Sequence, residues 1–168
     1  MGVDTTRVND NPFDFEDIKN ENVIDAEEHI VYSGCAIKKN QHGFRFYKIH
    51  VITDKYFYNL KSRTEVSRKI ALSKIVGITV SAAPECSKLV LHVHRDRDVE
   101  FDFVDKVTRS TFVEQLLGVT VTCKHFEVYD TELSKFCMTE TEVKHGRKSK
   151  MPNDNYRVED SEGEENRV

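Results

Sequence analysis

The chain has 168 residues, a formal net charge of -4 at pH 7, 38% hydrophobic and 32% charged residues, and no Trp. This composition is typical of a soluble globular protein, and the length favours one core with tails over two full domains. No apolar run approaches the roughly 20 residues that a membrane-spanning helix requires, so we predict no transmembrane segment.

Charge is distributed unevenly along the chain. Residues 1–28 hold nine acids against Arg7 and Lys19, and the last residues are again acidic, whereas residues 29–139 hold seventeen Lys and Arg against twelve Asp and Glu. Few apolar residues at either end could offset the entropy of ordering. We therefore predict an acidic N-terminal arm (1–26), one folded domain (27–139) and a charged C-terminal tail (140–168).

The N-terminus and the cysteines both favour the cytoplasm. The first twenty residues contain no apolar stretch of the kind that a secretory signal needs. The cysteines also lack the paired spacing of a zinc site or of a small disulfide scaffold, and are most simply reduced thiols. They are Cys35, Cys86, Cys123 and Cys137.

Alternation of apolar and polar residues with a period of two predicts about seven short strands in the folded part. Short polar segments separate them, among them the hairpin loop Lys39–Gly43 and the turn Asp54–Lys55. Gly77 is expected to mark a bulge. The predicted strands are 29–38, 44–53, 56–60, 67–72, 75–81, 88–94 and 98–104. This many short strands at close spacing favour a barrel or a sandwich.

One segment, residues 106–118, has helical spacing instead. Phe112 and Leu116 fall on one side of it, and Gly118 is suited to its end. We expect this helix to close one end of the barrel. Alternation resumes after it, which predicts an added strand within 119–129.

The order of these segments resembles the tail homology 1 domain of class-I myosins, a pleckstrin-homology-like module. The resemblance rests on VITDKYFYNL (51–60), RKIALSKIVGITVS (68–81) and KLVLHVHRDRDVEF (88–101), and covers roughly residues 32–118. It implies a closed, seven-stranded antiparallel barrel capped by one C-terminal helix. No motor head is present in the sequence, so we expect a free-standing module.

Modules of that family dock on membranes and bind anionic lipids, phosphoinositides especially, through basic residues of the first two strands. Carried over to this sequence, the resemblance implies Lys38, Lys39, Arg45 and Lys48 as head-group ligands. Pleckstrin-homology lipid motifs have a second basic residue two positions after Arg45, where this chain has Tyr47. Tight, stereospecific inositol phosphate binding therefore does not follow from the resemblance.

Residues 38–74 carry the sharpest charge asymmetry, with ten Lys and Arg against Asp54 and Glu65. Each such charge near an anionic leaflet would contribute about 1 kcal/mol of attraction. Solvated strand faces also carry charges that prevent edge pairing, so a purely structural interpretation stays open. Nucleic acid is a less favoured partner, because barrel packing explains the aromatic residues that could stack on bases. These are Phe44, Phe46, Tyr47, Tyr56, Phe57 and Tyr58.

The N-terminal arm offers two attachment features. Met1–Thr6 fits the myristoylation pattern with Gly2 as acceptor, although the following residues are acidic. A single myristoyl chain binds membranes only marginally, so the basic surface would be the second signal. Phe13, Phe15 and Ile18 interrupt the acidic run, and partner docking and docking on the module itself stay open for them.

His92 and His94 lie two residues apart on one predicted strand and share a face, as half of a metal site would. No nearby ligand spacing completes such a site, so we favour structural histidines and predict no metal or other cofactor. The chain also lacks a phosphate-binding glycine loop, and nothing in it supports a Cys–His nucleophile. We predict that it is not an enzyme.

Two functions remain open. In the first, a non-catalytic cytoplasmic module docks on anionic, phosphoinositide-containing membranes and links them to cytoskeletal or other protein partners. In the second, the barrel and its arms make protein contacts as a structural or adaptor subunit of a large cytoskeletal or other assembly. Vesicle binding would separate the two functions.

Overall fold

The computed structural model describes residues 8–9, 24–39, 44–62 and 65–152, with the backbone alone at 8–9 and 38–39. The predicted modification site Gly2 lies outside these residues. So do the arm residues Phe13, Phe15 and Ile18 and the predicted hairpin loop over 40–43.

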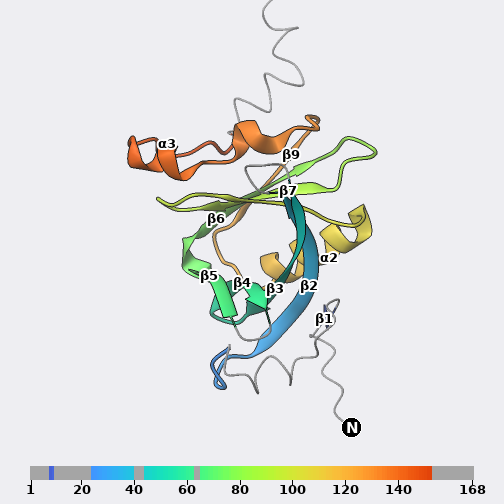
Figure 1. Ribbon diagram of the computed structural model, residues 1–168, viewed down its shortest axis with the longest axis vertical. Coiled ribbons are helices and arrows are strands. Elements are labelled where there is room, and N and C mark those ends of the chain that lie inside the picture. Colours follow the sequence, from blue (N-terminus) through green and yellow to red (C-terminus); the bar gives the residue numbers. More distant parts are fainter. Residues whose placement is uncertain (1–7, 10–23, 40–43, 63–64, 153–168) are drawn as a thin grey trace, which may run out of the picture.

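Strands β2 to β8 form the seven-stranded antiparallel arrangement that the sequence predicts. Their bounds are β2 (Ile30–Lys39), β3 (Arg45–Thr53), β4 (Tyr56–Ser62), β5 (Glu65–Ala71), β6 (Ile75–Ser81), β7 (Lys88–Val93) and β8 (Val99–Asp102), with the short helix η1 (Leu72–Lys74) between β5 and β6. Neighbours follow the order β5-β4-β3-β2-β8-β7-β6, each pair antiparallel. The short β1 (Val8–Asn9) pairs parallel to β2. In Figure 1, β2 extends from the lower strands, β3 to β5, to the upper strands, β6 to β8, which run across it.

The sheet is open, which differs from the closed barrel that the sequence predicts. Within the described residues, β5 pairs with β4 alone, while β6 lies between β7 and the added strand β9 (Lys124–Val128). Because β9 uses the backbone donors and acceptors along the outer edge of β6, that edge cannot pair with β5. The fold class is nevertheless the predicted one, mainly β with a helix over one end.

The core lies between the two groups of strands and is closed by α2 (Lys106–Leu117). Asp105 caps the helix by accepting a hydrogen bond from the Thr108 N–H (2.7 Å). The inward face buries Phe112 and Leu116 among the side chains of both strand groups. Burial of one such side chain stabilises the fold by about 1.5–3 kcal/mol, so packing holds the helix in place.

A C-terminal layer, residues 124–152, covers the outer face of the upper strands. It begins with β9, which extends the sheet parallel to β6, and continues with η2 (Leu133–Phe136) and α3 (Glu140–Lys144), which lie over that face. Figure 1 shows η2 and α3 on the side of the upper strands that faces away from α2. The added strand predicted within 119–129 is confirmed by β9. The domain limits at 27 and 139 stay a prediction.

The C-terminal layer lies close against β6 at Gly77. A Cβ at this position would lie 2.6 Å from the Met151 Sδ, so the absence of a side chain allows the approach. The β6–β7 register shifts between Ile75 and Gly77, which is the predicted bulge. On the outer face of β7, Val90 packs against Leu133 of the layer. The outward residues of β7 are therefore buried rather than solvated.

A buried carboxylate anchors the chain just before β2. Glu28 is 2% exposed, and its oxygens accept hydrogen bonds from Thr53 Oγ1 (2.6 Å) and Tyr58 Oη (2.7 Å). Burial and the bond to Glu28 raise the pKa of Tyr58. Glu28 therefore belongs to the packed part of the chain, although it ends the acidic run of residues 1–28. Two hydroxyl donors, one from β3 and one from β4, offset the cost of desolvating the Glu28 carboxylate. The charges near Glu28 in the sequence do not indicate these donors.

Candidate functional site

Three strand connections meet at one end of the sheet, away from α2, which we call the open end. β2 and β8 are antiparallel and pair at Ile37 and Asp102, so beyond Ile37 the β2–β3 hairpin extends toward the β7–β8 turn. From the other side, Arg68 of β5 contacts the same turn. The residues of the open end whose side chains are described are 44–48 of the hairpin, 61–62 and 65 at the β4–β5 connection, Arg68 of β5, and the turn 94–98.

The β2–β3 hairpin projects beyond its neighbours. Pairing between β3 and β4 begins at Ile49, and Ile37 is the β2 residue that pairs with β8, whereas the hairpin itself stays paired out to Lys39 and Arg45. On the β4 side, residues 45–48 therefore have no neighbouring strand among the described residues. Beyond the Ile37–Tyr47 pair, where β8 pairing stops, the hairpin is a two-stranded ribbon. Side chains on such a ribbon are exposed on both faces.

The four predicted lipid ligands all belong to this hairpin but divide between its faces. Lys38 lies opposite Phe46, and Lys39 lies opposite Arg45; only their backbone is described. By strand alternation, Lys48 occupies the face that carries the core further along β3, and Arg45 occupies the other face. Their role as lipid ligands stays a prediction.

The two predicted ligands with described side chains differ in charge balance. The Arg45 guanidinium lies 3.3 Å from an Asp102 oxygen in an exposed ion pair, so part of its charge is already neutralised. Lys48 has no carboxylate partner among the described residues, and its ammonium lies 5.8 Å from the centroid of the Phe46 ring.

Three aromatic side chains of the hairpin are exposed: Phe44 by 67%, Phe46 by 42% and Tyr47 by 76%. The prediction that barrel packing accounts for them is therefore wrong, whereas it is right for Phe57 and Tyr58, which are buried. The reason is the projection of the hairpin, because the core ends before these residues. Strand alternation alone cannot show where a strand leaves the core.

The β7–β8 turn brings arginines to the open end that sequence reasoning did not select as site residues. Arg68 donates to the Arg97 carbonyl (2.7 Å) and pairs with Asp96 (3.3 Å). Burial lowers the pKa of Arg68, and the nearby Arg97 acts in the same direction. Arg95 has a positive φ of 57°, which is uncommon for a residue other than Gly, and its side chain is exposed. The signal for them was the charged turn within KLVLHVHRDRDVEF.

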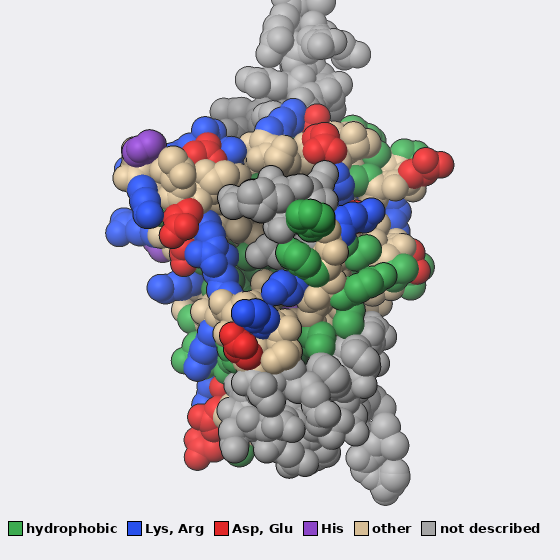
Figure 2. Space-filling model, in the orientation of Figure 1, with side chains coloured by type: hydrophobic (Ala, Val, Ile, Leu, Met, Phe, Trp, Pro, Cys, Tyr) green, Lys and Arg blue, Asp and Glu red, His purple; other side chains and the backbone are tan. Residues whose placement is uncertain are grey.

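The open end carries a surplus of positive charge. Among the described residues, three of its cations have a carboxylate partner, in the pairs Arg45–Asp102, Arg68–Asp96 and Lys61–Glu65. Three others have none there, namely Lys48, Arg95 and Arg97. Figure 2 shows Lys and Arg side chains along the left flank of the molecule, over the region of β5 and the β7–β8 turn. Such a surface attracts anions.

A groove of about 460 Å³ lies beside the hairpin but lacks this surplus. It is lined by Ile37, Arg45, Lys88, Glu100, Asp102, Glu132 and Ser134. Both of its cations are paired, Arg45 with Asp102 and Lys88 with Glu132 (3.0 Å). It is therefore a poorer site for an anionic group than the open end.

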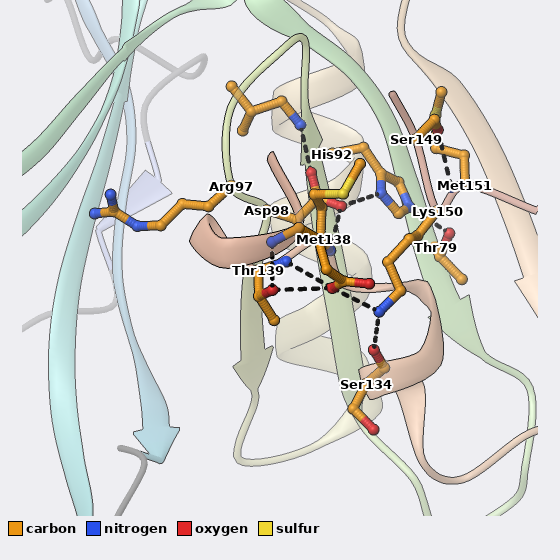
Figure 3. A network of polar contacts seen from close by, with 12 residues as sticks. Thr79, His92, Arg97, Asp98, Ser134, Met138, Thr139, Ser149, Lys150 and Met151 are labelled. Atoms are coloured by element: carbon orange, nitrogen blue, oxygen red, sulfur yellow. Dashed lines mark hydrogen bonds and ion pairs between the residues drawn. The ribbon is translucent and has the colours of Figure 1, made fainter. Parts of the chain in front are cut away.

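His92 is a structural residue beneath the C-terminal layer (Figure 3). Its Nε2 lies 2.7 Å from Thr79 Oγ1, and its Nδ1 lies 3.0 Å from Asp98 Oδ2. Both ring nitrogens are thus occupied, while His94 is exposed. No group of three metal-ligating side chains occurs in the part of the chain that the structure describes. Thr, His and Asp here share the connectivity of a catalytic triad, but Thr79 is fully buried and inaccessible to a substrate.

The four cysteines are free thiols. Cys86 is buried, and burial raises the pKa of Cys123 to about 11 and that of Cys137 to about 12. Protonated thiols are poor nucleophiles. The prediction that the protein is not an enzyme stays a prediction.

No family model and no curated protein matches the sequence. Among solved structures, the hSac2 domain from the human phosphoinositide phosphatase Sac2 has a TM-score of 0.52 at 11% identity, and the match covers 69% of this chain and 91% of that one. The Slm1-PH domain in complex with inositol-4-phosphate matches with a TM-score of 0.44 at 16% identity, over 55% of this chain and 98% of that one. The DH/PH domain of human ARHGEF11, in a complex with human RhoA, matches with a TM-score of 0.46 at 12% identity, over 55% of this chain and 29% of that one.

The fold is pleckstrin-homology-like. Seven antiparallel strands in the order given above, followed by one helix over an end of the core, decide this. The more specific resemblance to the myosin tail homology 1 domain stays a prediction. Within the described residues, no helix has both the length and the apolar character needed to span a bilayer.

Proposed function

We propose that this protein is a non-catalytic binding module that docks reversibly on anionic, phosphoinositide-containing membranes through its open end. The observation that carries this proposal is the set of three cations there, Lys48, Arg95 and Arg97, that lack a carboxylate partner among the described residues. At about 1 kcal/mol for each Lys or Arg near an anionic leaflet, these three contribute roughly 3 kcal/mol. That amount suits reversible binding in the cytoplasm. The resemblance to the membrane-docking module of class-I myosins supports the same role.

Head-group selectivity in this proposal comes from charge density rather than from stereochemistry. Arginine side chains hold phosphate oxygens in a two-point fork, and the turn presents two of them, Arg95 and Arg97. Arg45 contributes less, because Asp102 already neutralises part of its charge. Tyr47 stands where a second basic ligand is expected. A phosphoinositide with several phosphates is therefore preferred over phosphatidylserine, without a narrow choice among isomers.

Vesicle co-sedimentation tests this function. We expect binding at about 0.1 M salt, where the screening length is about 10 Å, to vesicles with a phosphoinositide and not to phosphatidylcholine alone. The paired substitution Arg95→Glu and Arg97→Glu is expected to abolish binding. Lys55→Glu is the matched control, since Lys55 is exposed at the β3–β4 turn, away from the open end. Equal binding of the two variants, or no binding by the unmodified protein, would refute the proposal.

A second candidate function, a subunit of a cytoskeletal or other protein assembly, is favoured by exposed apolar residues elsewhere. Val104 and Val107 are exposed where α2 begins, and Val121 and Tyr129 are exposed on the segment that flanks β9. They lie away from the open end, so a protein partner there is compatible with membrane docking. Two results together would favour this candidate. The unmodified protein would bind none of the vesicles, and the Val107→Cys variant would form a cross-linked complex with another protein through the introduced thiol.

A further inference from the structure

We infer that the β2–β3 hairpin inserts its aromatic side chains into the head-group and acyl boundary of an anionic bilayer, so that membrane binding has an apolar part besides the electrostatic one. This inference rests on the proposed function and adds to it the mode of contact. The residues are Phe44, Phe46 and Tyr47, which are exposed by 67%, 42% and 76%.

Clustering sets these residues apart from ordinary surface apolar residues. Single exposed aromatics are common on soluble proteins, but here three occur within four consecutive positions at the projecting part of the hairpin. Phe and Tyr are well suited to the boundary between head groups and acyl chains, because each has an apolar ring and Tyr adds a polar tip. The described part of the hairpin therefore presents exposed aromatic rings at the open end.

The charges next to the aromatic residues indicate an anionic bilayer as the partner. Arg45 and Lys48 lie between and beside the rings, and the hairpin segment 38–48 contains four Lys and Arg and no Asp or Glu. Basic residues at this level contact lipid phosphates while the rings lie deeper. A carboxylate would oppose insertion, and the segment carries none.

The aromatic side chains are exposed on both faces of the hairpin, which favours a lipid bilayer over a groove on a protein as the binding partner. By alternation, Phe46 lies on one face of the ribbon and Tyr47 on the other. Among the described residues, no β4 residue pairs with 45–48, and β8 pairing stops at Ile37, the residue opposite Tyr47. A groove on a folded partner would contact mainly one face and leave the other ring in water. A bilayer surrounds an inserted ribbon and contacts both faces.

The absence of Trp from the chain allows a direct test. Tyr47→Trp introduces a single Trp on the hairpin, and Tyr129→Trp introduces one at an exposed position beside β9 as the matched control. With vesicles of phosphatidylcholine and a phosphoinositide, we expect a blue-shifted emission and quenching by lipids brominated along the acyl chain for Tyr47→Trp. The Tyr129→Trp emission is expected to stay unchanged.

Affinity gives a second readout. The double substitution Phe44→Ser and Phe46→Ser is expected to weaken vesicle binding by about one to two powers of ten, since each 1.4 kcal/mol is a factor of ten. It should also remove the binding that survives at high salt, where electrostatic attraction is screened. Val104→Ser with Val107→Ser is the control pair of exposed apolar residues, and thermal unfolding verifies that all variants fold.

The outcomes separate the two proposals. Vesicle-bound Tyr47→Trp protein with unshifted, unquenched emission would overturn insertion, leave docking intact and assign the hairpin rings to a protein partner. No vesicle binding by the unmodified protein would overturn both proposals. Binding with a blue shift and with loss of affinity in the Phe44 and Phe46 variant supports insertion.

Discussion

His92 Nδ1 lies 3.0 Å from Asp98 Oδ2, and the two side chains are only 2% and 4% exposed. Asp98 also accepts the Val93 N–H through Oδ1 and the Met138 N–H through Oδ2, each at 2.9 Å. One carboxylate thus joins β7 to the C-terminal layer (Figure 3). The layer is therefore fastened to the strands by buried polar contacts as well as by apolar packing.

Replacing this carboxylate is expected to destabilise the protein. Asp98→Ala leaves two backbone N–H groups and one His nitrogen without their acceptor, so we expect the free energy of unfolding to fall by about 3 kcal/mol. Urea unfolding measures the change. His94→Ala, an exposed position on the same segment, is the control and should change stability little. A loss below 1 kcal/mol for Asp98→Ala would contradict the role given to the pair.

The His50 ring predicts a pH dependence of stability. It is fully buried, its centroid lies 5.0 Å from that of Phe101 and 5.2 Å from that of Phe112, and neither ring nitrogen has a hydrogen-bond partner among the described residues. Burial lowers the pKa of His50 from 6.5 to about 3. The unfolded chain therefore takes up a proton near pH 6.5 that the folded protein takes up only near pH 3.

Between these values the unfolded state binds more protons, so stability is full above pH 6.5 and falls as the pH is lowered. The slope from this group is about 1.4 kcal/mol per pH unit. We expect His50→Phe to remove that slope between pH 6.5 and 5, where carboxylates still remain ionised. Unfolding free energies of both proteins across this range provide the measurement, and parallel curves would show that His50 is not the responsible group.

The contacts of Arg109 indicate that this side chain anchors α2 to the strands. Its Nη1 donates to the carbonyl oxygens of Cys86 and Lys88, each at 3.0 Å, from a buried position. Arg109→Ala removes a donor that satisfies two carbonyl groups, and we expect a loss of about 2–4 kcal/mol in the free energy of unfolding. Thermal unfolding tests this, with the exposed neighbour Ser110→Ala as control. Equal stability of both variants would rule out the anchoring role.

Breaking the ion pair between Arg45 and Asp102 is expected to increase the affinity for anionic vesicles. Asp102→Asn removes the carboxylate that neutralises Arg45, so one more cation becomes available to an anionic leaflet. At about 1 kcal/mol per charge, vesicle affinity should rise about fivefold. Glu114→Gln, at an exposed position on α2, changes the net charge equally and serves as control. If both variants gain affinity alike, the effect is one of net charge and not of this ion pair.

Local patterns were sufficient to place most elements. Strand β6 has the predicted bounds, Ile75–Ser81, and α2 begins at the predicted Lys106, because strand and helix periods are properties of neighbouring residues. The residues of the candidate site could be predicted only in part. Lys48 and Arg45 were found through the hairpin, whereas the approach of Arg68 to the turn at Arg97 depends on how two distant strands are arranged.

The sequence by itself determined the order and type of the elements, the helix over the core and the basic character of the first hairpin. Only the tertiary structure decided that Arg45 is paired across 57 positions with Asp102, that the hairpin aromatics lie beyond the core, and that the C-terminal layer buries His92. Each depends on which strands become neighbours and where their pairing stops. Burial and charge compensation are set by those contacts between remote segments, and the alternation within one strand contains no record of them.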